Sequence, residues 1–93
     1  MLSKMPNELS KLSKEDLDRE ILRVGIIAEL DAINLYEQLA SITENQDIKK
    51  VLLDIAEEEK VHFGEFQELL LRIDHQQVDG IEKGKKEVKD LVG

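Results

Sequence analysis

Apolar residues recur along two long segments of the chain in steps of four and three, which is the spacing of one helix face. On the first segment these residues are Leu22, Ile26, Ile33, Tyr36 and Ala40. On the second segment they are Ile48, Leu52, Ile55, Phe66, Leu69 and Ile73. The pattern predicts two long helices, and the polar run at 43–46 predicts a tight connection between them.

Capping signals place the ends of these two helices. Ser13, followed three residues later by Asp16, resembles a capping box, so the first helix is expected over about 14–43. Asn45 is a suitable N-cap for the second helix, which is expected over about 46–73.

The two ends of the chain show weaker patterns. Residues 1–12 are expected to form a loosely held lead-in to the first helix. Beyond Asp74, Gly80 and Gly84 interrupt the sequence, and glycine weakens a helix. Only a short tail helix, over about 78–91, is therefore predicted there.

Three ionisable residues stand inside the apolar stripes. Glu29 takes a stripe position on the first helix, and Glu59 and His62 take the middle of the second stripe as a Glu-x-x-His pair. A carboxylate that faces a helix-bundle core is costly unless an opposite charge meets it. Glu-x-x-His alone is frequent on exposed helices, but the stripe placement of all three residues predicts a common metal site.

Composition restricts the chemistry. The chain has no cysteine, so any metal must be held by carboxylate and imidazole groups. The formal net charge of −8 argues against nucleic acid, whose phosphates require a basic surface. No apolar run approaches the roughly 20 residues needed to cross a bilayer, so no membrane association is expected. The sequence also contains no phosphate-binding loop and no nucleophile–base pairing.

A lone hairpin of this size cannot cover its own apolar surface. The 93 residues form one small half-domain, and the first helix has a second apolar face made of Leu17, Ile21, Val24, Ala28, Leu35 and Leu39. We therefore predict an all-α fold in which two antiparallel hairpins dimerise into a four-helix bundle. Two copies would supply two imidazoles and four carboxylates, and the four carboxylates balance the charge of two divalent cations.

The run from Ile27 to Tyr36, followed by Glu59-Lys60-Val61-His62, resembles the encapsulated ferritins. These half-length ferritin-like proteins reside inside encapsulin nanocompartments, and the resemblance extends from about Glu20 to Ile73. It implies that each subunit dimer holds two irons, with Glu29, Glu59 and His62 of both subunits as ligands. It also implies a decameric ring and an encapsulin shell protein as partner.

Other residues are expected near this site. The resemblance places Tyr36 close to it, and we interpret Tyr36 as an aromatic residue at the core edge. Asp31 corresponds to acidic residues that collect metal in the family, although Ala28 precedes Glu29 where a further acidic residue is often found. Glu58 and Glu65 flank the ligands closely enough to guide cations towards them.

The expected function is that of a ferroxidase, which oxidises iron(II) to iron(III) for mineral storage inside a cytoplasmic encapsulin nanocompartment. Zinc, calcium or manganese can take the place of iron in a crystal. One alternative is a rubrerythrin-like enzyme that reduces peroxide, which the lack of a Cys-x-x-Cys site disfavours. Another is a structural or cargo-adaptor hairpin without catalytic activity, whose buried polar residues fix the helix register.

The sequence ends at Lys89-Asp90-Leu91-Val92-Gly93, without the linker and the apolar-basic docking peptide of stand-alone family members. Other members are fused to the shell protein in one polypeptide. We therefore expect these residues to be the N-terminal module of a shell fusion, or a truncated form of a tagged cargo protein.

Overall fold

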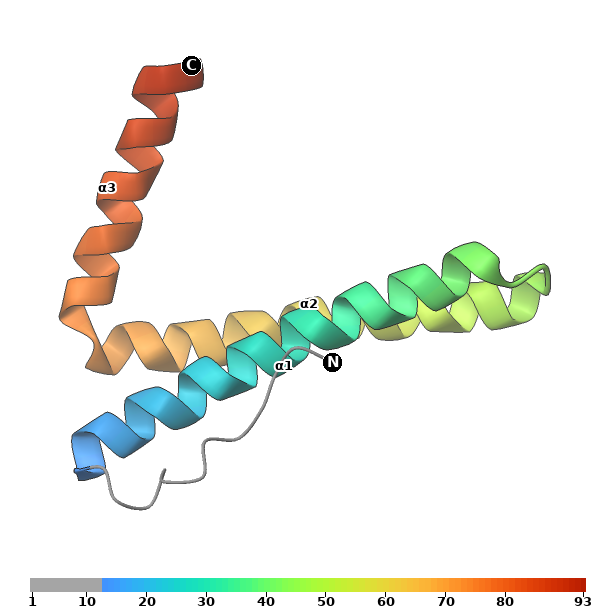
Figure 1. Cartoon of the computed structure of the whole chain (residues 1–93), viewed down its shortest axis with the longest axis horizontal. Coiled ribbons are helices and arrows are strands. Elements are labelled where there is room, and N and C mark those ends of the chain that lie inside the picture. Colours follow the sequence, from blue (N-terminus) through green and yellow to red (C-terminus); the bar gives the residue numbers. More distant parts are fainter. Residues whose placement is uncertain (1–12) are drawn as a thin grey trace.

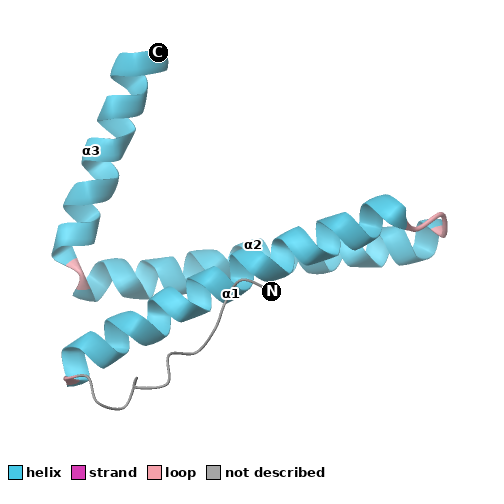
Figure 2. Ribbon diagram, in the orientation of Figure 1, coloured by secondary structure: helices cyan, strands magenta, loops and turns pink. Residues whose placement is uncertain are grey.

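The structure is a computed structural model, and it describes residues 13–93. Three helices make up this part of the chain: α1 (Lys14–Ile42), α2 (Gln46–Ile73) and α3 (His75–Val92). α1 and α2 form an antiparallel hairpin, and α3 leaves the open end of that hairpin at a steep angle (Figure 1). Figure 2 shows only short connections between the helices. The all-α prediction is confirmed, whereas the lead-in expected at 1–12 lies outside the described residues.

Side-chain caps begin the two hairpin helices where the sequence predicts them. The Ser13 hydroxyl accepts a hydrogen bond from the backbone N–H of Asp16 at 3.3 Å. The Asn45 side-chain oxygen accepts from the backbone N–H groups of Asp47 and Ile48 at 2.9 and 3.1 Å. These oxygens satisfy N–H groups that have no partner within the helix, so both helix starts are fixed by local chemistry.

The hairpin core is small. Among the described residues, only four apolar side chains are buried: Ile33, Ala40, Ala56 and Leu70. The second predicted stripe does not pack fully against α1, because Ile48 and Leu69 each remain 50% exposed and Ile73 44% exposed. One neighbouring helix can cover only one side of α2, so the outer part of the stripe is left uncovered within a single chain.

α3 corrects the prediction for the tail. The tail helix predicted over about 78–91 is present, but it is longer than expected: α3 is a continuous 18-residue helix over His75–Val92. Gly80 and Gly84 lie inside it, at a propensity cost of about 1 kcal/mol each relative to alanine. This cost is offset by a side-chain cap at Asp74 and by Val78 and Ile81, which are partly covered.

Asp74 is the single residue that connects α2 to α3. Its backbone N–H donates to the carbonyl of Leu70 at 2.9 Å and so closes α2. One carboxylate oxygen accepts from the backbone N–H of Gln77 at 3.0 Å and so opens α3. The other accepts from the Arg23 guanidinium of α1 at 2.9 Å, and the Asp74 side chain is only 10% exposed. A single residue therefore fixes the junction of all three helices.

None of the helices in residues 13–93 is long and apolar enough to cross a membrane.

Candidate metal centre

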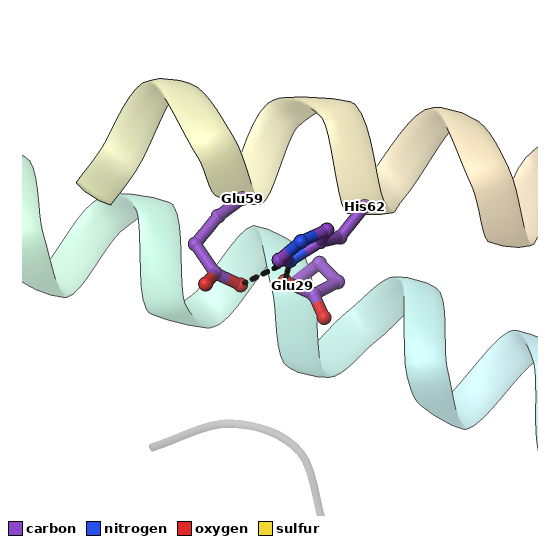
Figure 3. Close-up of side chains that lie close together, drawn as sticks. All are labelled: Glu29, Glu59 and His62. Carbon is purple, nitrogen blue, oxygen red and sulfur yellow. Dashed lines mark ion pairs between the residues drawn. The ribbon is translucent and has the colours of Figure 1, made fainter. Parts of the chain in front are cut away.

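Glu29, Glu59 and His62 lie together in the middle of the hairpin. Figure 3 shows Glu29 reaching from α1 towards Glu59 and His62 of α2. Each residue offers a ligand atom within 4.8 Å of the other two. Nδ1 of His62 is 3.8 Å from Oε2 of Glu29 and 3.6 Å from Oε2 of Glu59. The three residues predicted from the stripes are therefore brought together by the fold.

Their convergence follows from helix geometry. Glu59 and His62 are three residues apart, so both side chains project from the same face of α2. Glu29 occupies the facing position on α1, because the turn at residues 43–45 pairs the two helices in an antiparallel register. The pattern of the sequence and the register set by the turn are sufficient to build the group.

The Glu29 carboxylate lacks the partner that its burial requires. Its Oε2 atom is buried and makes no hydrogen bond with any described residue. The distance of 3.8 Å to the imidazole of His62 exceeds a hydrogen bond. Native proteins rarely leave a buried polar atom unsatisfied, and such an atom requires an explanation such as an ion. Two carboxylates and one imidazole are a donor set that iron, zinc and manganese accept.

The group is open on one side. The side chains of Glu29 and Glu59 are 16% and 20% exposed, whereas that of His62 is 47% exposed. The carboxylates are thus held between the two helices, and the imidazole reaches the hairpin surface. One hairpin therefore brings the three side chains together in a shallow, open group rather than an enclosed one.

The residues expected around the site do not join this group. Asp31 and Tyr36 are half-buried on α1, and Glu58 and Glu65 are exposed on α2. Among the described residues, the only cluster with metal-ligand geometry consists of Glu29, Glu59 and His62. Accessory roles for the other four residues remain predictions. His75 is exposed at the start of α3 and lies outside this group.

At Gly25, α1 lies directly against a side chain of α2. A Cβ atom placed on Gly25 would lie 3.3 Å from two ring carbons of Phe66. That spacing is closer than ordinary contact between carbon atoms, so glycine allows the backbone of α1 to lie directly against the ring. The sequence signal was a glycine inside an otherwise regular helix.

Comparison with known proteins identifies the family. The sequence matches the rubrerythrin family over residues 20–91. The chain is also similar to the crystal structure of the encapsulated ferritin domain from Pyrococcus furiosus, with a TM-score of 0.87 and 49% sequence identity. That similarity covers 100% of this chain and 97% of the other. The chain belongs to the encapsulated ferritins, within the rubrerythrin family.

Two curated relatives of this encapsulated ferritin are longer proteins. The ferritin-like–encapsulin shell fusion protein of Pyrococcus furiosus is 52% identical over 96 residues, which cover 100% of this chain and 28% of the relative. The encapsulin nanocompartment cargo protein EncC of Myxococcus xanthus is 43% identical over 67 residues, covering 72% of this chain and 51% of the relative. The chain thus spans about a quarter and about half of their lengths.

The family relates the site to a general class of chemistry. Ferritin-like di-iron proteins use a Glu from each of two helices and a Glu-x-x-His motif from each of two others. This encapsulated ferritin has one Glu of the first kind and one Glu-x-x-His motif. The family thus points to a di-iron oxidoreductase kind of activity.

Proposed function

We propose that this chain is a ferroxidase that oxidises iron(II) to iron(III) at a di-iron site shared by two copies of the chain. The observation that carries the proposal is the Glu29–Glu59–His62 group with its unpartnered, buried carboxylate oxygen. A cation bound by this oxygen would satisfy the burial cost that the chain alone leaves uncompensated. Carboxylate oxygens suit the reaction because they bind iron in both oxidation states.

A second copy of the chain completes the site. One hairpin supplies two carboxylates and one imidazole, which is half of the di-iron carboxylate set. Two copies supply four negative charges, which balance the four positive charges of two iron(II) ions. The half-exposed His62 side chain and the exposed Ile48 and Leu69 of α2 leave an apolar, ligand-bearing surface for the partner hairpin.

Each ligand has a distinct task. Glu29 and Glu59 bind the iron(II) substrate and neutralise its charge. The His62 imidazole binds without adding negative charge, and so prevents the site from becoming too anionic to release iron(III). Two iron(II) ions give up two electrons, which with two protons convert one molecule of dioxygen to hydrogen peroxide.

The decisive experiment adds iron(II) in air to metal-free protein and follows iron(III) formation by near-ultraviolet absorbance. Glu59→Ala and His62→Ala are expected to abolish the catalysed oxidation. Glu29→Ala is expected to impair the reaction and to change the oligomer, measured by light scattering with and without iron. Glu57→Ala is the matched control, because Glu57 is an exposed acidic residue of the same helix. Unchanged oxidation in all three ligand variants would rule the site out.

Peroxide reduction is the second candidate, because the sequence matches the rubrerythrin family. The same iron(II)-loaded protein can be given hydrogen peroxide in the absence of dioxygen. Faster oxidation by peroxide than by dioxygen, dependent on His62, would favour this activity over the ferroxidase reaction. A chain that binds no iron in either assay would instead favour the non-catalytic hairpin.

We further propose that the chain acts inside an encapsulin nanocompartment and releases iron(III) for storage there. The proposal is supported by the two relatives, one described as a shell fusion protein and the other as a nanocompartment cargo protein. A test produces shells that contain either the wild-type domain or His62→Ala and measures their iron content. Equal iron loading in both would contradict the storage role.

A further inference from the structure

The contact between Gly25 and Phe66 is unusually close for two helices. A Cβ atom on Gly25 would lie 3.3 Å from Cδ2 and from Cε2 of the Phe66 ring. Glycine inside a helix costs about 1 kcal/mol relative to alanine, so α1 gives up intrinsic stability at this position. The close contact with the ring is what that loss makes possible.

This contact lies directly beside the candidate metal centre. Gly25 is four residues before Glu29 on α1, and Phe66 is four residues after His62 on α2. Because the helices are antiparallel, the Gly25–Phe66 contact is one helical turn, about 5–6 Å, from the Glu29–His62 pair. The ring and the glycine therefore determine how closely the helix backbones approach each other next to the ligands.

Two buried residues lie on the other side of the ligands. Ile33 follows Glu29 by one turn and is 8% exposed, and Ala56 precedes Glu59 by three residues and is 1% exposed. The metal-binding group therefore lies between the Gly25–Phe66 contact and these two buried residues. Close-packed side chains transmit small displacements instead of absorbing them.

We propose that Gly25 and Phe66 are positioning residues, which set the separation of α1 and α2 at the metal centre so that Glu29 can share a metal with Glu59 and His62. The inference rests on the proposed metal site. Metal–ligand distances in proteins tolerate errors of only about 0.2 Å. A Cβ atom at position 25 forces the ring or the backbone to move by a few tenths of an ångström, which is enough to disturb the ligands one turn away.

Cobalt(II) binding tests the proposal without relying on enzyme activity. Metal-free protein is titrated with cobalt(II), whose visible absorption reports both the affinity and the geometry of the ligands. Gly25→Ala is expected to weaken cobalt binding about tenfold, as is typical for residues that support metal ligands, and to alter the spectrum. The double variant Gly25→Ala/Phe66→Leu removes the ring that the new Cβ atom meets, and is expected to recover much of the affinity.

Gly64→Ala is the matched control. Like Gly25, Gly64 lies inside a helix; it is in α2, two residues after His62. A Cβ atom built on Gly64 would meet nothing within 4 Å beyond the adjoining helix backbone, so there is open space beside it. Gly64→Ala is expected to leave cobalt affinity and spectrum unchanged. Phe66→Leu alone replaces the ring on α2 that contacts Gly25, and is expected to weaken cobalt binding. This variant keeps the inference testable if circular dichroism shows that Gly25→Ala does not fold.

The outcomes separate the inference from the proposed function. Equal cobalt binding by the wild type and His62→Ala would overturn the metal site, and with it the inference. Binding that depends on His62 but is unaffected by Gly25→Ala or Phe66→Leu would overturn only the positioning role. A loss in Gly25→Ala that the double variant recovers, with no change in Gly64→Ala, would support it.

Discussion

Glu29 and Asp74 are two shielded carboxylates with opposite surroundings. The Asp74 side chain is 10% exposed, and both of its oxygens are satisfied by the Arg23 guanidinium and the backbone N–H of Gln77. The Glu29 side chain is 16% exposed, and its buried Oε2 has no hydrogen-bond partner among the described residues. Burial alone therefore does not distinguish a structural acid from a functional one.

The difference lies in what each carboxylate gains from the chain itself. Asp74 faces the positive charge of Arg23 and caps the N-terminus of α3, so the fold itself satisfies both of its carboxylate oxygens. Glu29 is held close to a second carboxylate, Glu59, and to an imidazole that does not reach hydrogen-bonding distance. We expect Asp74 to stabilise the protein both with and without metal, and Glu29 to do so only when a cation is bound.

The largest expected effect is the dependence of stability on metal at Glu29. With zinc, a redox-inert probe, at about 100 times its dissociation constant, the wild type should gain about 3 kcal/mol of unfolding free energy. Glu29→Gln should lose most of that gain, because the amide cannot replace the carboxylate charge. Denaturant unfolding at fixed protein concentration, with zinc or with chelator, measures this gain for the wild type and for the variant. An equal gain in the variant would contradict the assignment of Glu29 as a ligand.

Asp74→Ala should destabilise the protein by about 2 kcal/mol, with or without metal, because it removes a helix cap and a charge-assisted hydrogen bond. The figure is moderate because Arg23 is 48% exposed and solvent screens the ion pair. Denaturant unfolding measures the change, and Asp79→Ala, at an exposed position of α3, serves as the control. If Asp74→Ala lowered the unfolding free energy only in the presence of metal, Asp74 would behave like Glu29 and the contrast between the two carboxylates would be wrong.

In chelator, Glu29→Leu should raise the unfolding free energy, whereas Asp74→Ala should lower it. Leucine restores the apolar stripe and removes a carboxylate that has no partner, so unfolding free energy should rise by about 1 kcal/mol. The same variant should bind no cobalt(II). A lower stability in metal-free solution would indicate that Glu29 has a structural partner after all.

The smallest effect concerns Asp16, an exposed carboxylate that does have partners. The Ser13 hydroxyl, and then the Arg19 guanidinium, hold the pKa of Asp16 below its ordinary value. Its contribution to stability is therefore present above the unfolded-state pKa and is lost as the pH falls through the folded-state pKa. Ser13→Ala should lower the unfolding free energy slightly at neutral pH, because it removes the N-cap and a hydrogen bond to the Asp16 carboxylate. Unfolding measured across acidic pH should show the gap to the wild type narrowing; a constant gap would contradict this linkage.

The hairpin and the metal-binding group were predictable because both depend on short-range patterns. Ser13 and Asn45 mark the helix starts, and the steps of four and three define the helix faces. Once the turn fixes the antiparallel register, Glu29, Glu59 and His62 have little freedom to lie elsewhere. The grouping of the three residues could be anticipated for the same reason, since polar residues interrupted an apolar stripe, whereas their binding of a metal remains a prediction.

Features that depend on contacts distant in sequence were not predicted. Arg23 and Asp74 are 51 residues apart, and nothing in the local pattern pairs them. α3 was predicted too short because Gly80 and Gly84 were interpreted as interruptions, whereas Asp74 was not recognised as its cap. Residues such as Leu69 and Ile73 were expected in the core, but helix periodicity cannot tell which neighbour covers a given side.

Because the single residue Asp74 connects α2 to α3, a small rotation at Asp74 moves the far end of α3 by a larger distance. At about 1.5 Å per residue, its 18 residues extend about 27 Å from the pivot. A rotation of about 10° at the pivot would displace the far end by about 5 Å, a distance that follows from the length of the helix. The hydrogen bonds of Asp74 to Arg23 and Gln77 therefore lie at the point where a small rotation would move the tip around Leu91 and Val92 most. A modest adjustment at one carboxylate can redirect a whole helix and the exposed apolar residues it carries.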